Sequence, residues 1–115
     1  MAESIFGIHA AALELRSQRM GLITANIANA ATPGYKARDI DFAAALKARS
    51  EGLGKDAAIA KTTQYRVPVM PSLDGNTVEM ATEQTAFTEN AVAYQATLGF
   101  IRGRVDTLTR ALKGD

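Results

Sequence analysis

Few side chains in this sequence could do chemistry. The single histidine, His9, lies in an alanine-rich stretch, and Asp39 and Asp41 are two residues apart. A lone imidazole has no neighbour to orient it, and the two aspartates lack a third ligand at metal-binding spacing. Asp41 is better placed to cap a helix that follows it. A small enzyme using His9 with either aspartate is an alternative, but we expect no enzyme, no metal site and no cofactor.

Composition also favours a structural or binding protein. The chain has 115 residues, 47% of them hydrophobic and 22% charged, with a net charge of +1 and no cysteine. One domain with a modest core fits this length, and disulfides and thiolate metal sites are excluded. Dispersed basic residues without an aromatic platform predict no nucleic-acid binding. No apolar run is long enough to span a membrane, so we expect no direct membrane span.

The N-terminal segment predicts a long amphipathic helix over residues 5–30. Apolar residues recur at steps of three and four, and Ser4 is a plausible N-cap. The helix is expected to stop at Thr32-Pro33-Gly34, because proline disfavours helix in the residue before it and glycine tolerates positive φ. Two asparagines, Asn26 and Asn29, occupy its last turn.

The C-terminal segment predicts a second helix over residues 77–112. Asn76 and Glu79 have the spacing of a capping box. The segment carries a regular seam of the kind that pairs with another helix by knobs-into-holes packing. Its members are Met80, Gln84, Phe87, Ala91, Tyr94, Leu98, Ile101, Val105, Leu108 and Leu112.

The two predicted helices differ in length. At 1.5 Å per residue the second would be about 54 Å long and the first about 39 Å. The first helix therefore cannot cover the whole seam of the second. Part of this apolar surface needs another partner, which favours oligomerisation. A regular stripe could also be an ordinary intramolecular core.

The middle of the chain, 38–73, predicts less regular structure. Asp41 can cap a short helix that ends near Arg49 and Ser50, and the glycine-rich residues 50–56 are typical of a mobile linker. Residues 65–71 contain two prolines and should be extended. We expect an all-α fold: long N- and C-terminal helices in an antiparallel coiled-coil hairpin, with an irregular, extended middle and one short helix. The expected divisions are 1–36, 37–73 and 74–115.

One string of residues resembles a known signature. Residues 26–36, NIANAATPGYK, resemble the N-terminal signature of bacterial flagellar axial proteins. The segments RDIDF (38–42), YRVP (65–68) and LDGNTVEM (73–80) narrow this resemblance to the flagellar basal-body rod proteins. The resemblance covers most of the chain at both ends and is weakest over 43–63.

This resemblance implies a structural subunit of the flagellar proximal rod that self-assembles through coiled-coil helices into a helical tube. Family members pass through the type III export apparatus without a cleaved signal, which agrees with an N-terminus that lacks a basic n-region. The implied location is the periplasmic rod of the basal body. The implied partners are other copies of the chain, other rod proteins, the adapter protein FliE, the MS ring and the export gate.

The expected subunit interface combines the turn around Thr32-Pro33-Gly34, here called the signature turn, with the apolar seams of the two helices. Its members are Ile8, Leu15, Leu22, Asn26, Asn29, Thr32, Pro33, Gly34, Tyr35, Phe87, Ala91, Tyr94, Leu98, Ile101, Val105, Leu108 and Leu112. The alternative interpretation is a cytoplasmic helical adapter or export chaperone, since the absence of a signal sequence alone predicts a cytoplasmic protein.

Overall fold

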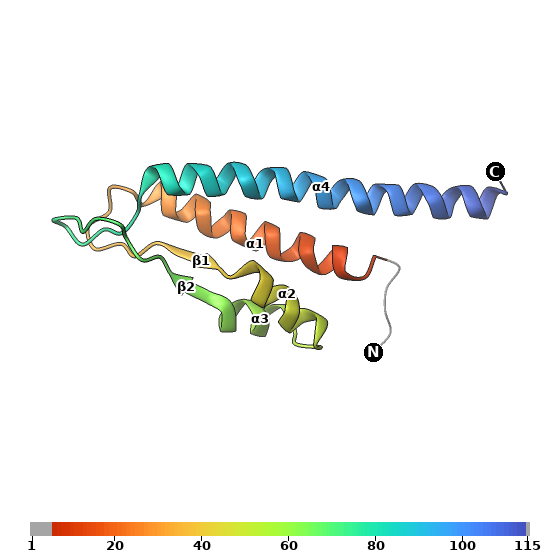
Figure 1. Ribbon diagram of the computed structural model, residues 1–115, viewed down its shortest axis with the longest axis horizontal. Helices are drawn as coiled ribbons and strands as arrows, with labels where there is room; N and C mark the ends of the chain where they lie inside the picture. The colour runs from red at the N-terminus through yellow and green to blue at the C-terminus, as the bar shows by residue number, and fades with distance from the viewer. Residues whose placement is uncertain (1–5, 115) are drawn as a thin grey trace.

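The helical patterns at the two ends of the sequence become two long helices that pack side by side (Figure 1). The computed structural model describes residues 6–114. In chain order these form α1 (Ile8–Ala28), β1 (Arg38–Ile40), α2 (Phe42–Ser50), α3 (Lys55–Thr62), β2 (Thr63–Tyr65) and α4 (Met80–Lys113). The particle is elongated, with extents of 64 × 26 × 18 Å.

Helix α1 follows the predicted segment with shorter ends. The predicted start at residue 5 and the predicted cap Ser4 lie outside the described residues. The helix ends at Ala28, two residues before the predicted end, because Asn29 turns away from helical geometry. Its side-chain amide donates to the Ala25 carbonyl oxygen at 2.8 Å, which also accepts the Asn29 backbone N–H at 3.1 Å. Gly34 in the turn has φ 76°, the left-handed region that glycine tolerates.

Helix α4 begins at Met80, three residues later than predicted, and the predicted capping box is wrong. Glu79 is at the N-cap position without a side-chain cap bond. Its carboxylate instead accepts from the Val69 backbone N–H at 3.1 and 3.2 Å. Asn76 reaches across to the turn after α1, as described below. The helix ends at Lys113, and Gly114 takes the left-handed conformation with φ 79°.

The middle of the chain is more ordered than the sequence predicted. Asp41 caps α2 by accepting from Ala44 N–H at 3.2 Å, which confirms the predicted short helix. The predicted linker at 50–56 is wrong, because the chain makes a turn there and enters α3. Strands β1 and β2 pair antiparallel with Ile40 opposite Thr63, so the all-α expectation is corrected to a mostly helical fold with a two-stranded sheet.

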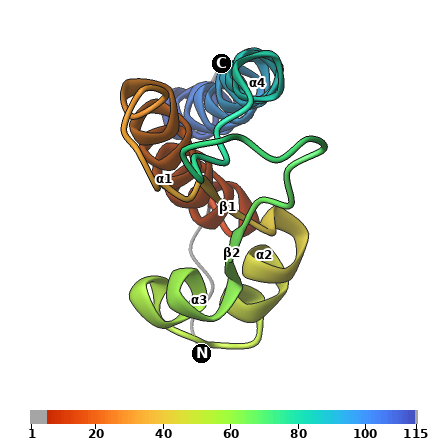
Figure 2. The same ribbon diagram turned by 90° about the vertical axis from the view of Figure 1, so that its left-hand side faces the viewer.

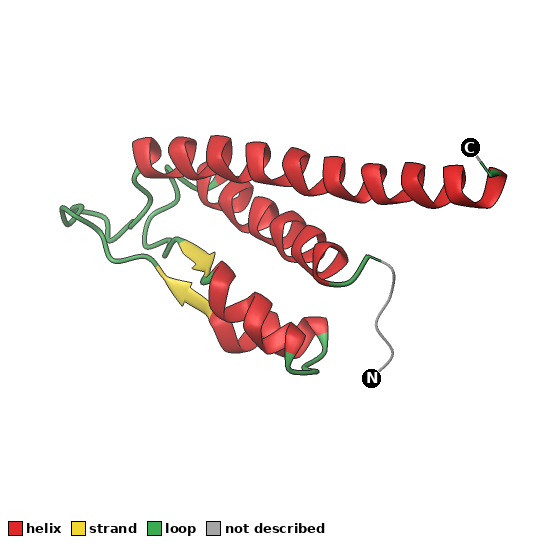
Figure 3. Cartoon of the chain, turned by 45° about the vertical axis from the view of Figure 1, so that its right-hand side comes forward, coloured by secondary structure: helices red, strands yellow, loops and turns green. Residues whose placement is uncertain are grey.

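Helix α1 lies between α4 on one side and, on the other, the elements β1, α2, α3 and β2, here called the middle unit (Figures 2 and 3). The apolar core forms on the side of the middle unit. Leu15, Ile40 and Ala45 are its buried centre, and Leu22, Phe42, Leu46 and Ile59 pack around them. Leu15 therefore joins α1 to β1 and α2, and this small core holds the middle unit against the hairpin.

The α1–α4 contact uses a different row of α4 from the predicted seam. The buried residues of α4, here called the inner row, are Glu83, Ala86, Asn90 and Thr97. The predicted seam, here called the outer row, is rotated by one residue and includes Phe87, Val105 and Leu108, all more than a third exposed. The antiparallel helix pairing is confirmed, but an apolar coiled-coil seam does not form it. Polar groups of α1 instead form hydrogen bonds with polar side chains of α4.

Candidate functional site

Asn26 is the centre of a polar cluster at the end of the hairpin where α1 ends and α4 begins. It is fully buried in the last turn of α1. Its amide nitrogen donates to the Arg38 carbonyl oxygen at 2.8 Å and to Glu83 Oε1 at 3.0 Å. Its amide oxygen accepts from the Arg38 backbone N–H at 3.1 Å and from the Tyr35 hydroxyl at 3.3 Å. One side chain therefore ties together α1, the turn, β1 and α4.

Four charged side chains continue this cluster across the molecule. Arg19 of α1 binds both carboxylate oxygens of Asp39, at 2.8 and 2.9 Å. Arg66 lies 3.1 Å from Asp39 and donates to both oxygens of Glu83, at 2.6 and 3.2 Å. We call Arg19, Asp39, Arg66 and Glu83 the ion chain. Bidentate arginine–carboxylate geometry gives both strength and directionality, so the chain fixes how the middle unit sits on both long helices.

These surroundings shift the pKa values of the two arginines of α1, Arg16 and Arg19. Hydrogen bonding to Asp39 raises the pKa of Arg19 above its ordinary value. Burial, and secondarily the charge of Arg19, lowers the pKa of the neighbouring Arg16. The Arg16 guanidinium lies 3.9 Å from the ring centroid of Phe42, a cation–π contact with α2. Both arginines interrupt the apolar face of α1 because they hold the middle unit.

Hydrogen bonds join the signature turn to the segment that precedes α4. Asn76 donates to the carbonyl oxygens of Asn29, Ala30 and Thr32 at 2.9, 3.1 and 2.7 Å. Thr77 accepts from the Ala37 backbone N–H at 2.8 Å and donates its own N–H to the Tyr35 carbonyl oxygen at 2.9 Å. The signature turn and the LDGNTVEM segment (73–80) therefore form the two sides of one hydrogen-bonded contact, here called the joint. This explains why both are polar and glycine-containing.

A second buried amide fixes the rotation of α4 further along the helix. Asn90 is 1% exposed and donates to the Arg16 carbonyl oxygen at 2.9 Å. Turning α4 so that its outer row faced α1 would break this bond and those of Glu83. A buried polar group left unpaired costs about 1–3 kcal/mol, which is enough to favour the observed rotation.

The two ends of the outer row consequently remain on the surface, whereas its middle residues Ala91, Tyr94, Leu98 and Ile101 are half-buried. Met80, Phe87, Val105 and Leu108 are about 40% exposed, and Leu112 is 88% exposed. Every residue from 102 to 113 is exposed, because α4 continues past the start of α1 (Figure 1). An apolar face of this length on a single chain is typical of a protein–protein contact.

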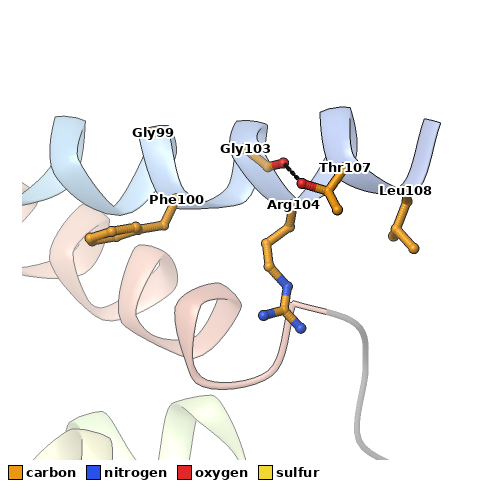
Figure 4. A pocket seen from close by; sticks show the side chains of 6 residues that line it. All are labelled: Gly99, Phe100, Gly103, Arg104, Thr107 and Leu108. Carbon is orange, nitrogen blue, oxygen red and sulfur yellow. Dashed lines mark hydrogen bonds between the residues drawn. The ribbon is translucent and has the colours of Figure 1, made fainter. Parts of the chain in front are cut away.

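A shallow hollow lies under this projecting part of α4 (Figure 4). Its volume is about 560 Å³, and it is lined by Gly99, Phe100, Gly103, Arg104, Thr107 and Leu108. A Cβ atom at Gly99 or Gly103 would meet nothing within 4 Å among the described residues. The two glycines therefore have no packing role inside this part of the chain, although each lowers helix stability.

The residues considered for catalysis have structural contacts instead. The His9 ring stacks on Phe100 with a centroid distance of 5.2 Å. Asp39 belongs to the ion chain, and Asp41 caps α2. Within residues 6–114 the structure brings together no group of three His, Cys, Asp or Glu side chains suited to a metal ion. In the same part of the chain no helix is long and apolar enough to cross a membrane.

The expected interface residues fall into three groups. Leu15 and Asn26 are fully buried within the chain, so they present no surface to a second subunit, and we do not carry them into the proposed interface. The carbonyl oxygens of Asn29 and Tyr35 accept hydrogen bonds within the joint, from Asn76 and Thr77. The others keep part of their surface: Ile8, Leu22, Thr32, Pro33, Gly34, Phe87, Ala91, Tyr94, Leu98, Ile101, Val105, Leu108 and Leu112.

Sequence reasoning missed the ion chain. Its members come from four separate segments, and only the packed fold brings Arg19, Asp39, Arg66 and Glu83 together. One signal was available: Arg19 interrupts an otherwise apolar face, and a charge in that position needs a partner. The identity of the partner could not be read from spacing.

Comparison with known proteins identifies the family. The family model for the flagella basal body rod protein matches residues 6–36, which cover α1 and the signature turn. The chain is 50% identical over 125 residues to the flagellar basal body rod protein FlgB of Cereibacter sphaeroides, covering 95% of this chain and 94% of that protein. FlgB of Escherichia coli K12 is 43% identical over 122 residues, covering 89% and 88%. FlgB of Aeromonas hydrophila is 40% identical over 126 residues, covering 98% and 96%. Identity at this level over nearly the whole length shows that the chain belongs to the FlgB family of flagellar basal body rod proteins, which are structural and not enzymatic.

Proposed function

We propose that this chain is a subunit of the proximal rod that self-assembles through α1 and α4 into a helical tube. Family membership supports a structural component of the flagellar basal body. The observation that carries the finer proposal is the set of exposed apolar residues on the outer row of α4, which are Met80 and Phe87 near its start and Val105, Leu108 and Leu112 near its end. A chain that folded only for itself would bury such a row.

The inner and outer rows of α4 have different roles. The inner row, with Glu83 and Asn90, fixes the rotation of α4 by hydrogen bonds to α1 and Arg66. The exposed residues of the outer row then point away from α1 in a defined direction, where a neighbouring helix can pack against them. Fully burying one such large apolar side chain contributes about 1.5–3 kcal/mol, so several of them can hold subunits together.

We further propose export by the type III apparatus without a cleaved signal and assembly in the periplasmic part of the basal body. The partners would be other copies, other rod proteins, the adapter protein FliE, the MS ring and the export gate. The exposed turn residues Thr32, Pro33 and Gly34 would join the outer row at these contacts. The basal body location itself follows from the family.

Substitution of Leu108 by aspartate tests the proposal. Leu108 lies on the outer row beyond the start of α1 (Figure 4), so the change should leave the monomer folded. Burying an unpaired carboxylate between subunits costs several kcal/mol, and we expect at least about a tenfold loss of incorporation. Incorporation is measured in basal bodies purified from cells lacking the native gene, together with swimming in soft agar.

Thr109→Asp is the matched control, because Thr109 is the adjacent exposed residue and lies about 100° around the helix. Circular dichroism of both purified variants should match that of the parent protein. Normal incorporation of Leu108→Asp would contradict assembly through the outer row. A cytoplasmic adapter or chaperone would also give a different result, since the parent protein would then be absent from purified basal bodies.

A further inference from the structure

The segment that precedes α4 contains the one Asp–Gly bond of the sequence, between Asp74 and Gly75. In such a pair the backbone nitrogen of the glycine can attack the side-chain carboxyl carbon of the aspartate, because glycine has no Cβ to obstruct the approach. The new C–N bond closes a succinimide ring, and the hydroxyl of the neutral carboxylic acid leaves with the amide proton as water. Asp74 is exposed, so solvent reaches this bond in the folded chain.

Water then opens the succinimide ring at either of its two carbonyl groups. Attack on the side-chain carbonyl restores aspartate, whereas attack on the main-chain carbonyl gives isoaspartate, in which the main chain runs through Cβ and Cγ of residue 74. The main chain is then longer by one methylene group. In the joint, the Asp74 carbonyl oxygen accepts from the Gly34 N–H at 2.8 Å, and the Gly75 carbonyl oxygen accepts from Lys36 Nζ at 2.6 Å. Isomerisation would displace both acceptors and so damage the joint.

The fold holds the Asp74 carboxylate in its ionised form. Oδ1 of Asp74 accepts from the Asn76 backbone N–H and from the Ser72 hydroxyl, both at 3.0 Å. These two hydrogen bonds, that of Asn76 first, lower the pKa of Asp74 below its ordinary value. The neutral acid is the form that closes the ring, because a carboxylate has no hydroxyl to lose. The two donors therefore reduce the amount of the reactive form.

The fold also holds the attacking nitrogen in an unreactive position. The Gly75 N–H donates to the Ser72 carbonyl oxygen at 3.3 Å, and Asp74 has no positive φ, which together are typical of a type I turn with ψ of Asp74 at about 0°. In the planar succinimide ring the Gly75 nitrogen must instead be coplanar with Cα and Cβ of Asp74. The Asp74–Gly75 peptide would have to rotate, and its carbonyl oxygen would then lose the Gly34 N–H. Opening of the joint therefore precedes ring closure.

We propose that Asp74–Gly75 is an isomerisation site that the joint protects: the folded chain suppresses isoaspartate formation there, and the unfolded chain permits it. This inference goes beyond the proposed function and does not depend on it. Since the joint must open before the ring can close, the rate in the folded chain follows the fraction of molecules with an open joint. A chain that stays unfolded accumulates isoaspartate at residue 74 and then cannot form the joint.

Ageing of the purified chain with and without guanidinium chloride tests the inference. Both samples are kept at the same pH and temperature. Aspartate and isoaspartate have the same mass, so the peptide that contains residue 74 is resolved by chromatography before mass spectrometry. We expect isoaspartate to form at least about tenfold more slowly in the folded chain, because local opening limits ring closure. Equal rates in the two samples would overturn the inference.

Ser72→Ala and Ser50→Ala are matched variants that locate the protection. Each removes one exposed serine hydroxyl, which donates to Asp74 in the first case and to the Lys47 carbonyl oxygen at 2.7 Å in the second. Without denaturant, Ser72→Ala should form isoaspartate at residue 74 several-fold faster than the parent chain, because the carboxylate loses a donor. Ser50→Ala should react at the parent rate.

Two controls accompany these variants. Circular dichroism should show the parent helix content for both variants, and in guanidinium chloride all three chains should form isoaspartate at the same rate. Equal rates for the two variants without denaturant would overturn the assignment of the protection to the contacts of Asp74. The comparison of the folded with the unfolded parent chain requires no substitution, so it tests the inference even if a variant fails to fold.

Discussion

Glu83 is a fully buried carboxylate with three hydrogen-bond donors around it. Two come from Arg66, and the third is the Asn26 amide. Burial of a charge is tolerated when its partners are well placed, and loss of one partner leaves the others unpaired. Arg66 also contacts Asp39, so the ion chain extends the effect of one carboxylate to α1 and the middle unit.

We predict that Glu83→Ala lowers the free energy of unfolding by about 3–5 kcal/mol, the usual cost of breaking a buried ion pair. The N–H groups of Arg66 and Asn26 that bond to Glu83 would then lose that acceptor, and Arg66 would keep only Asp39 as a charged partner. Glu89→Ala is the control, because Glu89 lies on an exposed face of the same helix, and its substitution should change stability by less than about 0.5 kcal/mol. Urea unfolding followed by circular dichroism measures both. Equal effects would show that the ion chain contributes little.

At the scale of elements, local chemistry predicted some features well. Asp41 predicted the cap of α2, and periodic apolar residues predicted both long helices. Sequence periodicity failed at the rotation of α4, because the strongest apolar row is not the row that faces α1. Glu83 and Asn90 decide that rotation through bonds to Asn26 and Arg16, and these bonds depend on distant residues.

The middle unit shows a different kind of failure. Gly52 and Gly54 predicted a flexible linker, whereas Gly52 takes φ 97° in a tight turn between two helices. The pairing of β1 with β2 joins segments more than twenty residues apart. Only three residues pair on each strand, too few for a visible alternating pattern. Tertiary packing, and not local propensity, creates this small sheet.

Substitution of Gly103 should have opposite effects on the stability of the isolated chain and on its assembly. A Cβ at this position meets nothing within 4 Å among the described residues. Gly103→Ala should therefore stabilise the isolated chain by up to about 1 kcal/mol through helix propensity. The same change should reduce incorporation into basal bodies if a neighbour approaches this surface closely.

The control for this test is Ala96→Gly, an exposed α4 position, which should destabilise the chain by a similar amount. Thermal unfolding of the purified variants gives the stability change, and the amount of subunit in basal bodies gives the assembly effect. A stabilised variant that incorporates normally would show that no neighbour needs the glycine.

At the scale of the whole molecule, the unequal lengths of α1 and α4 leave one part of the chain uncovered. With 34 and 21 residues they measure about 51 and 32 Å, and their contact is anchored by the polar joint at one end. The stacked pair His9 and Phe100 lies near the other limit of this contact. Beyond Ile101, every residue of α4 up to Lys113 is exposed.

We therefore predict two rates of amide hydrogen exchange along α4. In the isolated chain, amides of 102–113 should exchange rapidly, because only helix hydrogen bonds protect them and exposed helix ends open easily. Amides near the buried residues Glu83 and Asn90 should exchange more slowly, since opening there must also break the ion chain or the bond to Arg16. In purified basal bodies residues 102–113 should become protected to a similar extent, because a neighbouring subunit would cover Val105, Leu108 and Leu112. Mass spectrometry of peptides from both samples makes the comparison. Rapid exchange of 102–113 in the assembled rod would mean that this apolar part of α4 is not an interface, whereas slow exchange in the isolated chain would mean that it needs no partner to be stable.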